Sequence, residues 1–222
     1  MDRFLYVAMT GAKETLRAQT ANSHNLANAS TNGFRADLSA FQSRAVVGSG
    51  YASRVYATNT TTGWDPTVGA QMFTGRDLDV AIQGDGFIAV QGRDGREAYT
   101  RAGDLIIDTN GQLMTKTGLQ VMGDGGPMSV PPNNSLAISP DGTISIVPQG
   151  QGPETTASIG RIKLVNPGND LMDRGEDGLF RMRDGSDVPA DANVRVSSGA
   201  LEASNVNAAE SMVNMIELAR NF

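Results

Sequence analysis

The sequence offers little for catalysis that depends on histidine or cysteine, and no feature joins its scattered carboxylates into an acid–base pair. His24 is the only histidine, and the chain has no cysteine. A nucleophilic site needs a base that a third group holds in place, and a histidine-based metal site needs more than one histidine. His24 lies in a segment rich in alanine and asparagine, which supplies no such partners. We therefore expect no catalytic residue, no metal site and no cofactor, and we expect that the protein is not an enzyme.

Two glycine-containing segments resemble ligand-binding loops, but their contexts favour tight turns. The segment 84–86 reads Gly-Asp-Gly, yet a predicted strand follows it where a phosphate loop requires the N-terminus of a helix. The segment 108–111 reads Asp-Thr-Asn-Gly, as in part of a calcium loop. In that alignment Ile106 would occupy the first ligand position, and no glutamate stands at the twelfth. Asn-Gly between two strands predicts a hairpin turn instead.

Composition and charge exclude several further classes of protein. The chain has 222 residues, of which 39% are hydrophobic and 19% charged, as is ordinary for a folded protein. Its formal net charge is -6, and the sequence shows no basic face that would bind nucleic acid. No apolar run reaches the roughly 18 residues of a membrane-spanning helix. The N-terminus lacks the apolar core of a cleaved signal peptide, so we expect any export to use a route that removes none.

The residues that could bind a partner lie on two predicted amphipathic helices. The first covers residues 3–28, because Leu5, Met9, Ala12 and Leu16 recur at spacings that place them on one face. Cap and turn residues directly after this segment predict its end. The helix is long for one that has nothing beside it in the sequence to pack against.

The second helix begins after Asn207, which forms a capping pattern with Glu210 three residues later. Met212 and Ile216 then lie on one face, and Val213 widens that face. The pattern still runs at the final residue, so we expect the natural protein to continue beyond it. Each helix is marginal alone, so we expect the two to pair with each other and then with neighbouring copies; packing of both onto the β region is the alternative.

The centre of the chain predicts a mainly β fold. Residues 36–76 carry little pattern and predict an extended connector. From residue 77 the hydrophobic period changes to two, and Asp-Gly and Asn-Gly pairs separate short strands, as in a sandwich or barrel-like domain. The predicted strands cover residues 78–82, 87–90, 98–101, 105–108, 112–115, 136–139, 143–147, 159–165, 180–183 and 194–198.

Four ordered stretches of the sequence resemble the signatures of one protein family. They are ANSHNLAN at 21–28 with TNGFR at 31–35, DVAIQGDGF at 79–87, YTRAG at 99–103, and GALEASNVN at 199–207. In this order and over nearly the whole chain, they resemble the flagellar axial family of rod and hook proteins. The chain departs from the commonest form of these signatures at Ser23 and His24, at Ile88 and at Leu105.

The resemblance implies a fold that is mainly β with α. An all-β central domain is flanked by N- and C-terminal amphipathic helices, which pair as a coiled coil. The expected divisions are the first helix and its motif at 1–35, the connector at 36–76, the β-rich outer domain at 77–200 and the second helix at 201–222. The implied function is that of a structural subunit of the proximal rod of the bacterial flagellum. A distal-rod subunit is one alternative, and a β module that binds peptidoglycan or another envelope component is another.

The resemblance also implies partners and a location. The expected partners are copies of this chain, FlgC-like and FlgG-like rod neighbours, and the flagellar type III export apparatus. We expect assembly in the rod, which spans the periplasm, after export without signal cleavage. We expect no nucleic acid and no insertion into a membrane.

The expected assembly interface combines apolar helix positions with residues of the family signatures. The apolar side chains would be buried between helices of one subunit and its neighbours, and Gly33 would permit a sharp exit from the first helix. The residues of this interface are Leu5, Met9, Leu16, Asn25, Leu26, Asn28, Gly33, Phe34, Asn205, Val206, Met212, Val213 and Ile216.

Overall fold

The chain forms two compact units, one rich in helix and one rich in strand. The computed structural model describes residues 2–45, 55–152 and 155–220. The helical unit comprises Met1–Ser30, Arg35–Thr67 and Asn205–Phe222, and the β domain comprises Thr31–Phe34 and Val68–Ser204.

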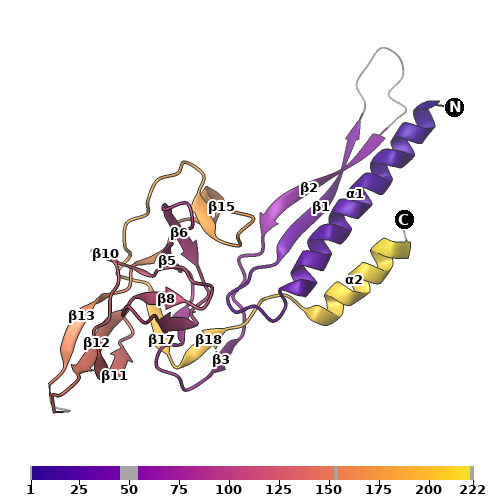
Figure 1. Cartoon of the computed structure of the whole chain (residues 1–222). Helices are drawn as coiled ribbons and strands as arrows, with labels where there is room; N and C mark the ends of the chain where they lie inside the picture. Colours follow the sequence, from indigo (N-terminus) through magenta and orange to yellow (C-terminus); the bar gives the residue numbers. More distant parts are fainter. Residues whose placement is uncertain (1, 46–54, 153–154, 221–222) are drawn as a thin grey trace. The chain divides into compact units, whose positions relative to one another are not determined.

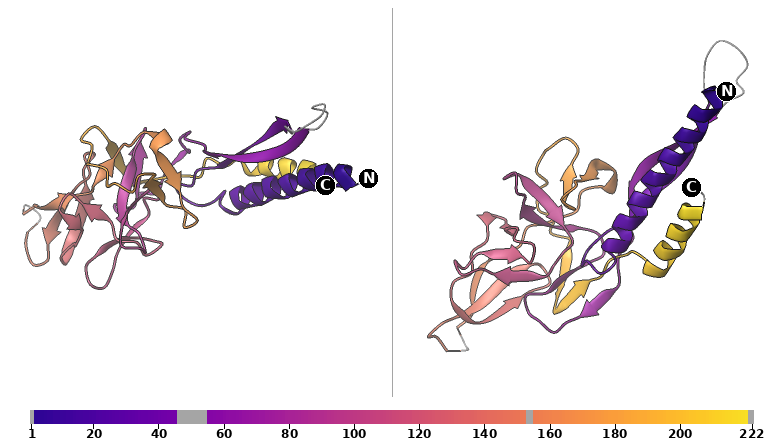
Figure 2. Two further views of the ribbon diagram at one scale, coloured as in Figure 1. Left: turned by 90° about the horizontal axis from the view of Figure 1, so that it is seen from above. Right: turned by 45° about the vertical axis from the view of Figure 1, so that its right-hand side comes forward.

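The helical unit is built from two helices and one β hairpin (Figure 1). Helix α1 spans Asp2–Ala27 and helix α2 spans Ala208–Arg220, while strand β1 (Asp37–Ala45) pairs in antiparallel fashion with strand β2 (Val55–Trp64). Helix α1 contacts α2 and both strands, and the two helices run in opposite directions (Figures 1 and 2). The predicted pairing of the terminal helices is therefore confirmed, whereas its coiled-coil form stays a prediction.

Small side chains lie where the two helices meet. Ala18 of α1 and Ser211 of α2 are both buried. The Asn22 side-chain amide donates a hydrogen bond of 2.7 Å to the backbone carbonyl of Ser211. Small residues at such a contact let two helices approach closely, and the hydrogen bond fixes one helix along the other.

Asn207 caps the start of α2. Its side-chain oxygen accepts hydrogen bonds from the backbone N–H groups of Ala209 at 3.1 Å and Glu210 at 3.3 Å. These N–H groups belong to the first turn, where a helix offers them no partner of its own. The cap predicted at Asn207 is therefore confirmed.

Strands β1 and β2 lie inside the segment 36–76, which the sequence predicts as an extended connector. Their pairing runs from Asp37 opposite Trp64 to Ala45 opposite Val55. Most side chains of β1 are exposed, so no alternation of apolar and polar residues marks the strand. Backbone pairing and packing against α1 form the hairpin. The predicted domain boundaries themselves stay predictions.

The β domain consists of short strands arranged in several small sheets. One sheet has five strands in the order β14-β5-β6-β16-β15, and another has the order β11-β12-β13. Two-stranded pairs are β17-β4, β18-β3, β7-β8 and β10-β9. These elements are β3 (Gln71–Phe73), β4 (Val80–Gln83), β5 (Phe87–Gln91), β6 (Glu97–Thr100), β7 (Leu105–Ile107), β8 (Leu113–Thr115), β9 (Met122–Gly123), β10 (Gly126–Pro127), β11 (Asn133–Ile138), β12 (Thr143–Pro148), β13 (Ala157–Arg161), β14 (Leu164–Val165), β15 (Met172–Arg174) after the 3-10 turn Asn169–Leu171, β16 (Phe180–Met182), β17 (Arg195–Ser198) and β18 (Ala200–Glu202).

Aliphatic side chains from most of these sheets form the core of the β domain. Val80, Ile88, Leu105, Ile144 and Ile162 are among its fully buried members. Each such side chain contributes about 1.5–3 kcal/mol when it leaves water. The core therefore joins sheets that the short strands alone could not stabilise.

One predicted strand is divided in the structure. The prediction of a continuous strand at 159–165 is wrong, because the chain changes partners within it. Strand β13 pairs with β12, whereas β14 pairs with β5. Between them, Ile162 forms an isolated bridge with Gly123. Hydrophobic patterning shows that the segment is buried but does not show which strand it pairs with.

A buried ion pair joins several segments of the β domain. Arg101 Nε donates to Glu202 Oε2 at 2.8 Å, and both side chains are almost fully buried. The N–H of Gly69 donates to Glu202 Oε1 at 2.9 Å, and the N–H of Gly33 donates to the Glu202 carbonyl at 2.8 Å. Arg101 Nη2 donates to the carbonyl of Gly84 at 2.6 Å. Because a buried charge without partners is costly, these contacts hold five separate segments together.

Removing the Glu202 charge is expected to destabilise the β domain. In a Glu202→Gln variant, Arg101 stays buried without its counter-charge, and the free energy of unfolding should fall by about 3 kcal/mol. Chemical denaturation of the chain measures this change. The matched control is Glu176→Gln, an exposed position in the same domain, which should change the free energy by less than about 0.5 kcal/mol. Equal midpoints for the two variants would contradict this role of the ion pair.

Gly103 is expected to tolerate no side chain. Its carbonyl accepts a hydrogen bond of 2.9 Å from the N–H of Val80, and a Cβ atom at Gly103 would overlap the backbone carbonyl of Val80. Gly103→Ala should therefore lower the free energy of unfolding by about 3 kcal/mol, since backbone atoms must move apart. Gly125→Ala is the control, because a Cβ there meets no atom within 4 Å. Thermal unfolding of both variants measures the difference, and similar melting temperatures would refute the predicted clash.

Candidate assembly interface

The exposed face of α1 carries the apolar side chains predicted to bind neighbouring subunits. Leu5 is 66% exposed, and Met9 and Leu16 are also exposed. The opposite face holds the buried Ala18 and faces the rest of the helical unit. The periodicity that places these residues on one face is therefore confirmed, but the face is not covered within the subunit.

Helix α2 shows the same arrangement. Ile216 is 69% exposed, and Met212 and Val213 are exposed as well, whereas Ser211 is buried. Large apolar side chains in water are unfavourable, and burying each one contributes about 1.5–3 kcal/mol. Contiguous apolar surface of this kind is typical of an interface with another protein. It stays a prediction that these three side chains of α2 and the three exposed apolar side chains of α1 contact neighbouring subunits.

Asn25, another residue of the predicted interface, makes contacts inside the subunit. It is buried, its amide donates to the Asp37 carbonyl at 3.0 Å, and its side-chain oxygen accepts from the Asp37 N–H at 2.7 Å. The neighbouring His24 places Nδ1 2.6 Å from the Asp37 carboxylate. These bonds tie the end of α1 to the start of β1.

Asn205 has a corresponding role at the start of the C-terminal segment. Its side-chain oxygen accepts from the N–H of Ala36 at 2.7 Å, and its amide donates to the carbonyls of Asp65 and Thr67 at 3.1 Å each. Arg35 Nη1 also donates to the Thr67 carbonyl. Asn205 therefore joins three stretches of chain within the helical unit.

Gly33 and Phe34 lie in the β domain. Gly33 has φ +67°, in the left-handed region that favours glycine, and a Cβ there would overlap the backbone of Arg101. The Phe34 ring centroid lies 4.7 Å from the guanidinium carbon of Arg174. The backbone at Gly33 is therefore one that glycine favours, six residues after the end of α1; its role in the exit from the helix and a contact of either residue with a neighbouring subunit stay predictions.

The three remaining residues of the predicted interface are half-buried. The Asn28 side chain donates to the carbonyl of His24 at 2.9 Å, and Leu26 and Val206 are partly covered. The predicted set therefore divides into exposed apolar residues on the helices and signature residues with contacts inside the subunit.

Sequence patterning missed several exposed aromatic side chains. Phe73 on β3 is 85% exposed, and Tyr6 on α1 and Phe41 on β1 are about half exposed. Phe73 and Phe41 lie in the segment predicted as a connector, where no strand period was visible to assign a face. Tyr6 could have been found, because it neighbours Leu5 on the exposed side of α1.

Neither a metal site nor a membrane helix is present in the described part of the chain. Among residues 2–45, 55–152 and 155–220, no three His, Asp or Glu side chains lie close enough to hold a metal ion. Within the same ranges, no helix has both the length and the apolar character needed to cross a bilayer.

Two parts of the chain match known protein families. Residues 81–146, in the β domain, match the family described as flagellar hook protein FlgE/F/G D1 domain. Residues 197–222, which include α2, match the family described as flagellar basal body rod FlgEFG protein C-terminal. Both matches are to proteins of the flagellar axis.

Curated relatives match the chain over its full length. It is 45% identical to the flagellar basal-body rod protein FlgF of Escherichia coli and 44% identical to that of Salmonella typhimurium, over 100% of this chain and 90% of each relative. It is 33% identical to the flagellar basal-body rod protein FlgG of Buchnera aphidicola, over 98% of this chain and 91% of that relative. The higher identity to FlgF favours that protein over the distal-rod alternative. The chain belongs to the FlgF family of flagellar basal-body rod proteins.

Proposed function

We propose that this chain is a structural subunit of the flagellar basal-body rod and that it assembles through the exposed apolar faces of α1 and α2. The observation that supports this most directly is the exposure of Leu5, Met9 and Leu16 on α1 and of Met212, Val213 and Ile216 on α2. These side chains lie on the two helices that pair with each other, so one subunit presents both faces from the same unit.

The energetics of these faces suit repeated contacts between subunits. Each large side chain contributes about 1.5–3 kcal/mol when buried, so six give on the order of 10 kcal/mol. Association costs at least about 4 kcal/mol in lost translation and rotation, besides the ordering of side chains. A contact that buries one or two of these residues would be weak, whereas contacts that bury most of both faces would be stable.

The proposed partners are copies of this chain and the neighbouring rod proteins, FlgC-like on one side and FlgG-like on the other. The 33% identity to a FlgG relative over 98% of this chain supports related helices in such neighbours. We further propose that the chain reaches the periplasm through the flagellar type III export apparatus without cleavage of a signal peptide. Its place would be the rod of the basal body.

A structural role without catalysis fits the chemistry of the chain. The sequence has one histidine and no cysteine, and His24 is engaged with the Asp37 carboxylate. The side chains of Arg101 and Glu202 are buried, and they pair with each other and with backbone groups of neighbouring segments. These charged groups therefore stabilise the fold. We therefore propose that the protein transmits force and catalyses no reaction.

Charged substitutions on the helix faces are expected to abolish assembly. Leu16→Asp and Ile216→Asp each put a carboxylate where a neighbouring subunit would cover it, at a cost of several kcal/mol per contact. In cells that lack their own copy of this subunit, the variants should be absent from purified hook–basal bodies, and swimming in soft agar should be lost.

Leu171→Asp is the matched control for these variants. Leu171 is 55% exposed and Leu16 is 48% exposed, but Leu171 lies in the 3-10 turn of the β domain. The control should be incorporated normally. Circular dichroism of each purified chain should show an unchanged fold. Normal incorporation of both helix variants, or equal loss with Leu171→Asp, would contradict assembly through the helix faces.

A further inference from the structure

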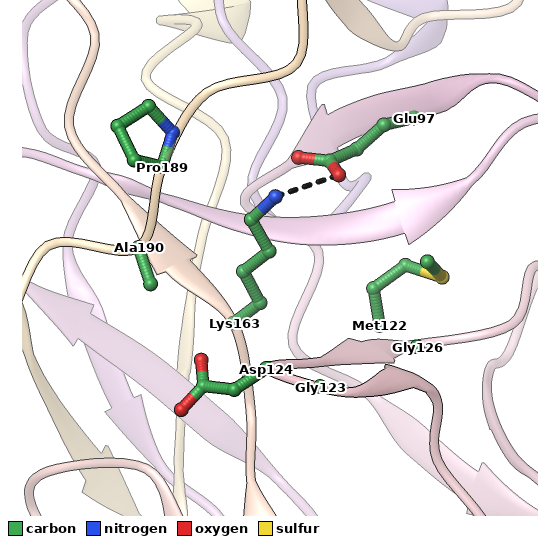
Figure 3. Close-up of a pocket in the computed structure, with 8 residues that line it drawn as sticks. All are labelled: Glu97, Met122, Gly123, Asp124, Gly126, Lys163, Pro189 and Ala190. Carbon is green, nitrogen blue, oxygen red and sulfur yellow. Dashed lines mark hydrogen bonds and ion pairs between the residues drawn. The ribbon is translucent and has the colours of Figure 1, made fainter.

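The largest charges around a pocket of the β domain are already paired. Lys163 Nζ lies 2.7 Å from Glu97 Oε2 in the wall of this pocket, and both side chains are mostly buried (Figure 3). Tyr99 forms a side-chain hydrogen bond with the same carboxylate. The carboxylate is therefore neutralised within the domain, and the pair belongs to the fold. Unpaired charges lie instead on the helical unit, beside a second hollow.

This hollow is a groove of about 300 Å³ between the two helices and β1. Phe41 is 53% exposed and Leu38 is 41% exposed, so the β1 side of the groove leaves apolar surface in water. Burial of such surface by a partner is favourable. We call this hollow the helix groove, and the residues that line it include Ala18, Ala21, Asn22, Leu38, Phe41 and Leu218.

Polar groups that line the helix groove already have partners inside the subunit. The Asn22 amide donates to the Ser211 carbonyl at 2.7 Å, and the Asn25 side chain exchanges two hydrogen bonds with the backbone of Asp37. Satisfied groups of this kind do not require a polar ligand. The helix groove therefore suits apolar side chains.

The exposed apolar stripe of α1 lies on the side of the helix opposite the helix groove. Successive residues of an α-helix turn by about 100° around its axis, so Met9 and Leu16 lie within about 20° of each other. Ala18 and Asn25, which line the helix groove, lie about 180–200° from Leu16 on the same count. A stripe and a groove on opposite sides of one helix cannot meet in a single two-fold pair, so copies that join them associate head to tail.

The stripe and the helix groove agree in length. Met9 and Leu16 are seven residues apart, and so are Ala18 and Asn25. Each pair spans about 10 Å along the helix. Two apolar side chains of one copy can therefore occupy the groove of another without displacement of either helix.

One exposed charge accompanies each surface. Lys13 stands between Met9 and Leu16, four residues after the first and three before the second, so it borders the stripe. Glu217 lines the helix groove. Both side chains are exposed, and neither forms an ion pair with another residue in the described part of the chain. Their opposite signs make the two surfaces electrostatically complementary.

We propose that the helix groove receives Met9 and Leu16 from a second copy of this chain, and that Lys13 of the second copy pairs with Glu217. This inference rests on the function proposed above and adds which two faces meet. Each copy presents one stripe and one groove, so the contact repeats in one direction, as a closed ring or a helical series.

Cysteine cross-linking in assembled basal bodies tests this contact, because the chain has no cysteine of its own. Two forms with different tags, Lys13→Cys and Glu217→Cys, are expressed together in cells that lack their own copy of the subunit. Purified hook–basal bodies are then treated with bismaleimidoethane. A product that joins the two forms is expected, and no product from either form alone. Lys13→Cys with Asp170→Cys, an exposed position of the β domain, is the control and should give no product.

The outcomes separate this inference from the proposed function. A product of Lys13→Cys with itself would show that two stripes face each other and would overturn the inference, although assembly through the helix faces would stand. Basal bodies that contain both forms but give no mixed product would overturn it as well. Failure of the proposed function has another signature, namely normal incorporation of Leu16→Asp and Ile216→Asp.

Charge reversal tests the Lys13–Glu217 pair independently. Lys13→Glu and Glu217→Lys each bring like charges together and should lower incorporation into basal bodies roughly fivefold. A chain with both substitutions restores opposite charges and should be incorporated to within about twofold of the unmodified chain. Asp170→Lys, which does not line the groove, is the control and should change nothing. A double variant no better incorporated than the single variants would overturn the pairing.

Discussion

A carboxylate that has no access to water must have its charge balanced where it lies, and Glu202 meets this demand with groups from distant parts of the chain. Arg101 and Gly69 each donate to its carboxylate, and Gly33 donates to its backbone carbonyl. Gly33, Gly69 and Glu202 all lie within three residues of points where the chain passes between the β domain and the helical unit. The carboxylate and the backbone carbonyl of Glu202 together therefore fix, inside the β domain, the segments that enter and leave it.

In the helical unit, the neutral side chain of Asn205 joins separate segments of the chain by hydrogen bonds. Its amide bonds to Ala36, Asp65 and Thr67, which flank the same crossings. Asn25 adds the bond between the end of α1 and Asp37. These two signature residues therefore have specific hydrogen-bond partners within one subunit, as buried polar groups require. The exposed apolar residues of α1 and α2 have no hydrogen-bonding side-chain groups that require a specific partner. They are therefore the residues proposed to contact other subunits.

The sequence predicts the parts of the fold in which a local rule decides the outcome. The stripe through Leu5 and Leu16 and the cap at Asn207 mark the helices, and Asn-Gly and Asp-Gly pairs mark turns between strands. The β1–β2 hairpin escaped prediction because the mostly exposed side chains of β1 leave no period and because the pairing of the two strands is not encoded by a local pattern. The division near Ile162 and the Arg101–Glu202 ion pair depend on which distant segments meet, which no local pattern encodes. Periodicity finds the apolar residues of the proposed interface, whereas no local pattern reveals the internal contacts of the signature residues Asn25 and Asn205.

Charge and apolar surface act over different distances, and this difference bears on when such a subunit assembles. The formal charge of -6 makes free copies repel, although salt limits that repulsion to roughly 10 Å. Burial of the helix faces stabilises only at contact and grows with the number of side chains covered. When two free copies touch through only a few residues, the free energy gained by burial does not offset the translational and rotational entropy lost on association. If the helix faces form the proposed subunit contacts, an assembly that covers both α1 and α2 at once offsets this cost, and addition to an existing assembly is then favoured over pairing of two free copies.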